Sequence, residues 1–143
     1  MPSNPPSGAN HEVRVLDFPF PSAVAIFDLP SLFAGKLHAL LCREYVKGRD
    51  WYDFLWYVSR GISVNHSLLS SALFQTGFWA GQAVNADDAW CGKEVAAKIQ
   101  ALDFSKVRED VRRFLKPIEL PLLELWSNDF FLGQSAKLFG RLN

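Results

Sequence analysis

Apolar residues recur at helical spacing along most of the chain and alternate with polar residues only near its start. Residues 12–16 (EVRVL) alternate as a half-buried strand does, and the pattern resumes at residues 23–27 (AVAIF) after Pro19 and Pro21 interrupt it. From residue 29 onward, apolar positions three and four apart prevail. We therefore expect a mainly α fold with a short N-terminal β segment, and we expect residues 1–10 to be loop.

Capping residues, glycines and prolines delimit the expected helices. Asp28, with Pro30 in the first turn, signals a helix start, and this helix should run to about Glu44. A second helix should begin near Asp50 and end at Gly61. Further helical patterns cover residues 67–74, 87–102, 106–115 and 122–142. The expected units are residues 1–28, with loop and short strands, and a helical domain over residues 29–143.

Composition and charge describe a globular chain the size of one ordinary domain. The 143 residues are 49% hydrophobic and 14% aromatic, which excludes a long disordered region. Its 15 basic and 15 acidic residues cancel, so no global positive field draws the chain to nucleic acid or membrane, and any RNA contact would be local.

Cysteine usage and the absence of long apolar runs bear on the compartment. Cys42 and Cys91 show neither metal-ligand spacing nor a disulfide framework, which is typical of a reducing, cytoplasmic setting. No basic and apolar leader is present, and no window approaches the ~20 apolar residues that a spanning helix needs. We therefore expect no membrane partner.

Lys36 is unusual because it is a cation set among apolar residues of an amphipathic helix. Leu32, Phe33, Ala39 and Leu40 lie three and four residues away on either side, so we expect all five side chains to share one face that packs on a core. An ammonium removed from water without a partner costs several kcal/mol. Acidic partners are therefore expected nearby.

Asp50 and Asp53 are the nearest candidates, and two interpretations of them remain open. Three residues apart on a helix, they share a face, and one lysine facing two carboxylates could bind a triphosphate, hold a divalent cation or accept a proton from a hydroxyl. Alternatively, Asp50 caps the helix N-terminus while Lys36 extends its ammonium to water and pairs with Asp53. Lys47 and Arg49 fit solvated charges of the turn equally well.

The remaining polar and aromatic clusters favour structural roles. The three histidines lack metal-ligand spacing, so we expect no metal site built on them. Asp87 and Asp88 indicate a helix start, and the arginines of residues 108–113 indicate a solvated face. The five tryptophans are expected in the core or at an interface. No substrate pocket can be isolated from the sequence.

Two motifs resemble the AbiEii/AbiGii-type toxin nucleotidyltransferases of abortive-infection and toxin–antitoxin systems. LFAGKLHAL carries Lys36 and Ala39, matching that family's lysine with an alanine three residues on. RDWYDFLWY carries Asp50 and Asp53, matching the family's pair of aspartates ahead of an apolar helix. The segments NPPSGA, FPFPSAV, DVRRFL and LWSNDFF extend the resemblance over nearly the whole chain. The implied fold is the C-terminal helical part of an α+β nucleotidyltransferase.

The resemblance implies an activity, a substrate and partners. The family transfers a nucleoside monophosphate from a nucleoside triphosphate with Mg²⁺, in known cases onto the 3′ end of tRNA, and a cognate antitoxin restrains it. By this resemblance Lys36 would contact the triphosphate, Asp50 would be the catalytic or magnesium-proximal acid, and Asp53 would support either role.

The chain departs from the family in its catalytic motifs. The family's Gly-rich turn and acidic-x-acidic pair are absent, since none of the 9 glycines are adjacent and no acidic residue is followed two residues later by another. We therefore expect a C-terminal portion that is inactive alone, with residues 1–28 the remnant of the nucleotidyltransferase sheet. The alternative is a non-catalytic helical module that binds an antitoxin, RNA or a separate catalytic half. Without the rest of that sheet, the strands over residues 12–27 would leave an edge prone to self-association.

Overall fold

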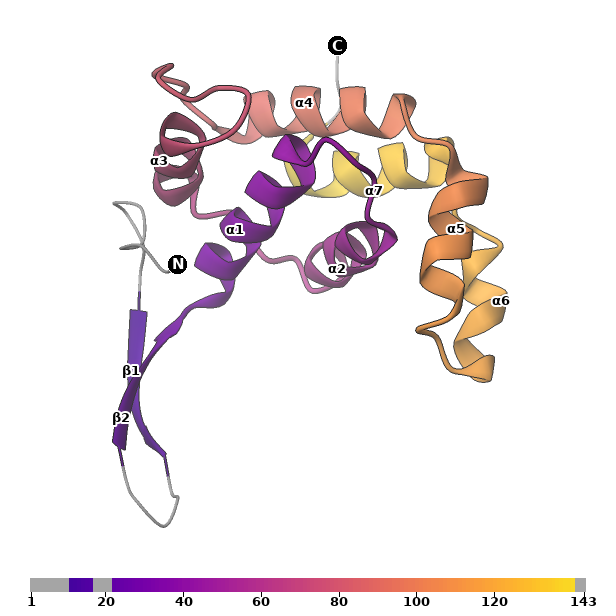
Figure 1. Cartoon of the computed structure of the whole chain (residues 1–143), viewed down its shortest axis with the longest axis horizontal. Coiled ribbons are helices and arrows are strands. Elements are labelled where there is room, and N and C mark those ends of the chain that lie inside the picture. Colours follow the sequence, from indigo (N-terminus) through magenta and orange to yellow (C-terminus); the bar gives the residue numbers. More distant parts are fainter. Residues whose placement is uncertain (1–10, 17–21, 141–143) are drawn as a thin grey trace.

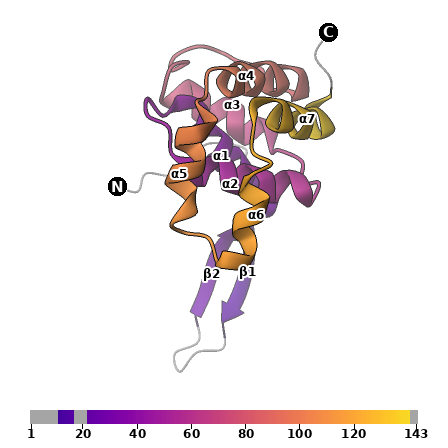
Figure 2. The ribbon, with the colours of Figure 1, turned by 90° about the vertical axis from the view of Figure 1, so that its right-hand side faces the viewer.

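The computed structural model describes residues 11–16 and 22–140, which form a hairpin followed by packed helices (Figure 1). Strands β1 (His11–Leu16) and β2 (Ser22–Phe27) pair antiparallel, with His11 opposite Phe27 and Leu16 opposite Ser22. The hairpin projects away from the helices in both side views (Figures 1 and 2). The loop expected at residues 1–10 and the interruption at Pro19 and Pro21 lie outside the described residues.

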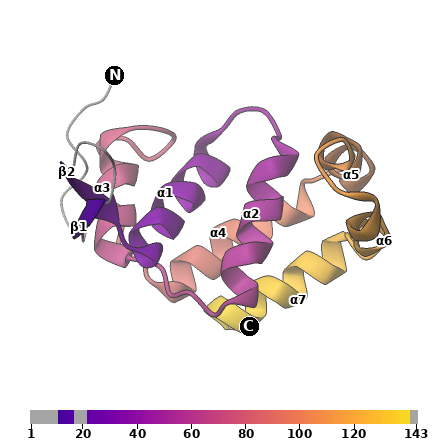
Figure 3. The same ribbon diagram turned by 90° about the horizontal axis from the view of Figure 1, so that it is seen from below.

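The expectation of a mainly helical chain is confirmed. The elements after the hairpin are α1 (Leu29–Cys42), α2 (Gly48–Ser59), α3 (His66–Gln75), α4 (Asp88–Gln100), α5 (Phe104–Arg112), the 3-10 turn η1 (Pro117–Glu119), α6 (Leu120–Leu123) and α7 (Asn128–Phe139). α1 packs against α2 and α3, α2 against α5 and α7, and α4 against α7 (Figure 3). None of the described helices is long and apolar enough to cross a membrane.

Aspartates begin α1 and α4 as the sequence indicates. Asp28 accepts a hydrogen bond from the backbone N–H of Ser31 at 3.0 Å, and Asp87 accepts one from the N–H of Trp90 at 2.9 Å. Each carboxylate satisfies a backbone donor that the first helical turn leaves without an intrahelical acceptor. Both predicted helix starts are confirmed.

Gly61 ends α2 as expected. Its φ of +63° lies in the left-handed region that glycine adopts without a steric penalty. This conformation lets the N–H of Gly61 donate to the carbonyl of Val58 at 3.0 Å and the N–H of Ile62 donate to that of Tyr57 at 3.1 Å. These paired bonds satisfy the last carbonyls of the helix and turn the chain toward α3.

The single helical pattern expected over residues 122–142 is wrong. α6 ends at Leu123, and α7 begins only after Ser127, whose side chain accepts from the N–H of Phe130 at 3.1 Å. Between them Trp126 turns inward until it is 5% exposed, and its carbonyl accepts from Arg108 Nη1 at 2.6 Å. A buried tryptophan and a serine cap therefore outweigh the continuous helical spacing.

An aromatic cluster joins α2, α5 and α7 in the core. Phe131 of α7 is fully buried and is its centre, with ring centroids between 4.9 and 6.4 Å from those of Trp51, Phe54, Phe104, Phe130 and Trp126. Several of these pairs meet edge to face, the arrangement that aromatic quadrupoles favour. The core therefore fixes α2, which carries the predicted aspartates, against the rest of the domain.

Candidate functional site

Lys36 of α1 contacts both predicted aspartates of α2. Its Nζ lies 3.0 Å from Asp50 Oδ1 and 3.0 Å from Asp53 Oδ2. Asp50 is 2% exposed, whereas the side chains of Asp53 and Lys36 are 29% and 23% exposed. The structure thus brings together the three residues singled out in the sequence, with a buried carboxylate on one side of the ammonium and a half-buried one on the other.

The expected orientation of α1 needs a correction. Lys36 was expected in the middle of the core-facing stripe, but Leu32 is 43% exposed and Ala39 is half-buried. The buried stripe runs instead through Phe33, Ala34, Leu37, Leu40 and Leu41. Lys36 lies at the edge of this stripe, where its stem covers apolar surface while its ammonium reaches the aspartates.

Arg43 completes the site, and sequence reasoning missed it. It follows α1 directly, and its Nε donates to Asp50 Oδ2 at 2.7 Å while its Nη1 donates to the hydroxyl of Tyr45 at 3.0 Å. The two oxygens of one buried carboxylate therefore bind two cations. The signal in the sequence is its spacing of seven residues from Lys36, which places both on one side of a helical pattern.

Asp50 does not cap α2, contrary to the structural interpretation considered for it. The N-cap position is Lys47, whose side chain makes no capping hydrogen bond. The N–H of Gly48 is instead satisfied by Asp110 Oδ2 of α5, at 2.6 Å. The other half of that interpretation, the pairing of Lys36 with Asp53, is confirmed.

The network carries more positive than negative charge. Arg49 Nε lies 3.7 Å from Asp53 Oδ1, so three cations (Lys36, Arg43 and Arg49) surround two carboxylates. Burial by itself lowers the pKa of the Lys36 ammonium, but hydrogen bonds with Asp53 and Asp50 outweigh burial and raise the pKa above its ordinary value of 10.5. Lys36 is therefore a permanent cation at neutral pH.

These carboxylates do not fit a divalent cation. Both oxygens of Asp50 and both of Asp53 are engaged by ammonium or guanidinium groups. A metal ion between them would have to displace cations and bind beside the remaining ones. Among the described residues, no group of three or more His, Cys, Asp or Glu side chains could hold a metal.

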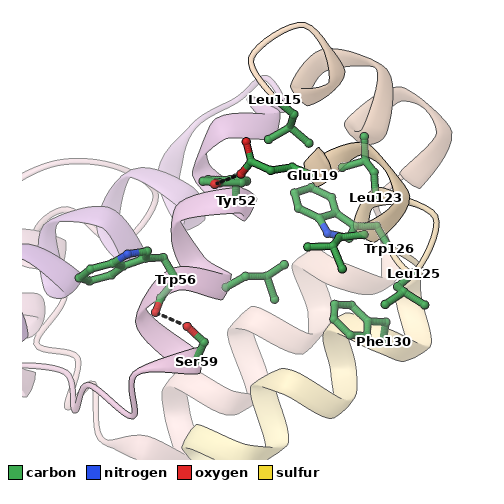
Figure 4. Close-up of a pocket in the computed structure, with 11 residues that line it drawn as sticks. Tyr52, Trp56, Ser59, Leu115, Glu119, Leu123, Leu125, Trp126 and Phe130 are labelled. Atoms are coloured by element: carbon green, nitrogen blue, oxygen red, sulfur yellow. Dashed lines mark hydrogen bonds between the residues drawn. The ribbon is translucent and has the colours of Figure 1, made fainter. Parts of the chain in front are cut away.

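An apolar groove of about 330 Å³ lies on another part of the molecule, between α2, α6 and the start of α7 (Figure 4). Leu55, Trp56, Leu122, Leu125 and Phe130 are among its lining residues. Its polar groups are few, and Tyr52 donates its hydroxyl to Glu119 Oε2 across one end at 3.2 Å. The groove offers apolar contact and no anion-binding cluster, so it is a separate feature from the Lys36 network.

The other residues singled out in the sequence have structural partners. Arg112 and Arg113 pair within α5 with Glu109 and Asp110, and Arg108 supports the turn at Trp126. Of the tryptophans, Trp51 and Trp126 are buried as expected, but Trp56 is 37% exposed beneath the guanidinium of Arg60.

Comparison with known protein families identifies a family whose model matches this chain. The model described as "Nucleotidyl transferase AbiEii toxin, Type IV TA system" matches residues 3–133, which is most of the chain. Comparison with the curated proteins and with the solved structures gives no significant match. The matched range contains Lys36, Arg43, Asp50 and Asp53.

Proposed function

The chain belongs to the nucleotidyl transferase AbiEii toxin family of type IV toxin–antitoxin systems, and from this premise we propose that its helical domain serves NMP transfer onto RNA. The donor would be a nucleoside triphosphate, and the acceptor would be the 3′ end of a tRNA in the cytoplasm. Transfer of this kind would serve abortive infection. A toxin of this family implies an antitoxin as partner. The network of Lys36, Arg43, Asp50 and Asp53 carries this proposal.

Lys36 is the proposed contact of the triphosphate. An ammonium has three N–H donors, and the two aspartates account for two of them. The side chain retains 23% exposure, so the third donor can reach a phosphate oxygen from solvent. Arg49, whose side chain is 55% exposed, adds a second cation at the other carboxylate oxygen of Asp53. Positioning and charge neutralisation of this kind supply most of the catalysis in phosphoryl transfer.

The two aspartates differ in what they can do. The resemblance makes Asp50 the catalytic acid, but its burial and its two cationic partners support a positioning role, in which it holds Lys36 and Arg43. Asp53 is the more exposed carboxylate and is the proposed acid nearer to the ligand. Because these carboxylates do not fit Mg²⁺, any ion that a nucleotidyltransferase uses would be held by other residues.

The 143-residue chain alone is not expected to transfer nucleotides. Its sequence contains no acidic-x-acidic pair and no adjacent glycines. We propose that residues 1–28 belong to a nucleotidyltransferase sheet and residues 29–143 form the helical domain that binds the triphosphate beside it. Purified chain incubated with tRNA and radioactive nucleotides should therefore give no labelled RNA.

Calorimetric titration of ATP and CTP into the chain tests the binding proposal. Lys36→Gln should weaken triphosphate binding about tenfold or more, because it removes the ammonium that would donate to a phosphate oxygen. Lys93→Gln removes an equal charge from an exposed position on α4 and should leave binding unchanged. Circular dichroism of both variants serves as the control that they are folded. Equal affinities of the two variants would refute the triphosphate site.

A second function, that of an interaction module, is favoured by exposed apolar side chains in and next to the groove. Ile118, Leu122 and Leu125 are 84%, 63% and 58% exposed. Neighbouring exposed apolar side chains of this kind mark protein contact sites. Two results together would favour this function over transfer. The chain would co-purify with a co-expressed antitoxin and lose it in Leu122→Ser, and Lys36→Gln would leave triphosphate affinity unaltered.

A further inference from the structure

A second surface with exposed aromatic rings and cations lies beside the Lys36 network, at the C-terminal end of α1. Tyr45, in the segment after α1, is 64% exposed, and Phe78, in the segment between α3 and α4, is 57% exposed. We propose that this surface, made of Arg43, Tyr45, Phe78 and Lys98, holds the unpaired 3′ end of the acceptor RNA. This assignment rests on the function proposed above. We call these residues the α1-end surface.

Contacts across three segments of the chain hold the surface together. The Nζ of Lys98 in α4 donates to the backbone carbonyl of Arg43 at 3.4 Å and lies 5.8 Å from the ring centroid of Phe78. The guanidinium of Arg43 lies 5.7 Å from the ring centroid of Tyr45 and donates to its hydroxyl. The two rings are therefore connected by two cations, although they are 33 residues apart.

The segment before Phe78 is pressed against α1. Gly77 has a φ of +97°, and a Cβ at this position would lie 2.5 Å from the Sγ of Cys42. Thr76 accepts a hydrogen bond through its carbonyl from His38 Nε2 at 3.0 Å, with the imidazole in the tautomer that donates there. Phe78 thus follows a backbone held in place by α1, so its exposed ring is presented from a fixed base.

Charge and exposed rings together favour nucleic acid as the occupant. The cations here are Arg43, Lys98 and, nearby in the chain, exposed Lys47. They outnumber the two acids, Glu44 and the buried Asp50 that pairs with Arg43. Unpaired bases stack on exposed aromatic rings while cations contact the backbone phosphates. Two exposed rings, each with a cation against it, suit consecutive bases of an RNA strand better than the single base of a nucleoside triphosphate.

The position of the surface suits an acceptor strand. Arg43 and Lys36 bind the two oxygens of the same carboxylate, Asp50. An RNA end held at Arg43 and Tyr45 would therefore lie next to a triphosphate at Lys36. A transferase needs its acceptor site and its triphosphate site to be adjacent, because the acceptor hydroxyl and the reacting phosphate must be held in contact.

Fluorescence anisotropy with a labelled single-stranded RNA tests the proposal. The RNA has about eight nucleotides, a length within the range that single-strand-binding proteins cover. Tyr45→Ala and Phe78→Ala should each weaken RNA binding about tenfold. Phe78→Tyr, which keeps an aromatic ring, should bind RNA as tightly as the native chain. Lys98→Gln should lower the slope of log affinity against log salt by about 0.7, the effect of one lost phosphate contact. Trp56→Ala, which removes another partly exposed ring stacked with an arginine, should change nothing.

Triphosphate binding by the same variants separates this proposal from the proposed function. Tyr45→Ala and Phe78→Ala should leave ATP affinity unchanged; a parallel loss would show that the rings bind the donor's base instead. RNA binding that neither variant weakens, or that Trp56→Ala weakens equally, would overturn the α1-end surface while a Lys36-dependent triphosphate site stands. Self-association abolished by Phe78→Ala would assign the surface to a protein contact and overturn it too.

Discussion

The ammonium of Lys36 and the carboxylate of Asp50, 14 residues apart in sequence, lie 3.0 Å from each other in a position where Asp50 is 2% exposed. A carboxylate with so little solvent depends on its partners for nearly all of its stabilisation. Lys36 and Arg43 each bind one of its oxygens, so the ion cluster joins the middle of α1 and the residue after its end to the first turn of α2.

Removal of the buried carboxylate should destabilise the fold more than removal of its neighbour. Asp50→Asn leaves two half-buried cations without their shared anion, and we expect a loss of about 3 kcal/mol in the free energy of unfolding. Asp53→Asn should cost about 1 kcal/mol, because Asp53 is 29% exposed and water replaces much of the interaction. Urea unfolding at pH 7 measures both, and equal losses would contradict the burial of Asp50.

The raised pKa of Lys36 predicts a loss of stability in alkali. The folded state binds this proton more tightly than the unfolded state, so the stabilisation is fully present below pH 10.5 and is lost as the pH rises through the folded-state pKa. Lys36→Arg keeps its charge throughout this range. Urea unfolding at several pH values above 10.5 should therefore show a steeper decline for the native chain than for Lys36→Arg. Parallel declines would show that Lys36 is not the titrating group.

The two cysteines should differ in reactivity. Cys91 is fully buried, and burial, with the charges of Asp88 and Asp87 adding to it, raises the pKa of its thiol to about 12. Cys42 is half-buried, and burial raises the pKa of its thiol as well. A thiol reagent at pH 8 should leave Cys91 unmodified in the folded chain and modify Cys42 slowly. Cys42→Ser should abolish native labelling, and both thiols of the original chain should react in urea.

Gly48 and Gly35 form a matched pair in which alanine should have opposite effects. A Cβ on Gly48 would lie 2.6 Å from Val111 Cγ2 and 2.9 Å from the carbonyl oxygen of Val107, so α2 and α5 would have to separate. Gly48→Ala should cost about 1–3 kcal/mol. Gly35, on α1, has nothing within 4 Å of its Cβ position, and Gly35→Ala should stabilise by about 0.5–1 kcal/mol. Thermal unfolding distinguishes the two.

Because of the hairpin, we expect self-association that increases with protein concentration. In the described sheet β1 pairs with β2 alone, so each strand has one side without a strand partner in this part of the chain. Such edges pair readily with other chains. Light scattering over a concentration series should show growth in apparent mass. A constant monomer mass at high concentration would contradict this expectation.

The sequence by itself determined most of the helix ends and three residues of the ion cluster, Lys36, Asp50 and Asp53. Asp28, Asp87 and Gly61 delimit helices through hydrogen bonds to residues within four positions, so a single sequence is enough to locate them. A lysine among apolar positions likewise requires an acid nearby. Asp50 and Asp53 were predictable partners for this reason.

Tertiary packing decided the rest. The binding of Arg43 to Asp50, the hydrogen bond from Gly48 to Asp110 and the grouping of Tyr45 with Phe78 and Lys98 join segments whose distance depends on how the helices pack. The break between α6 and α7 follows the burial of Trp126, which overrides helical spacing. Periodicity describes which side of a helix a residue occupies, whereas the neighbour that it meets there is set by the whole core.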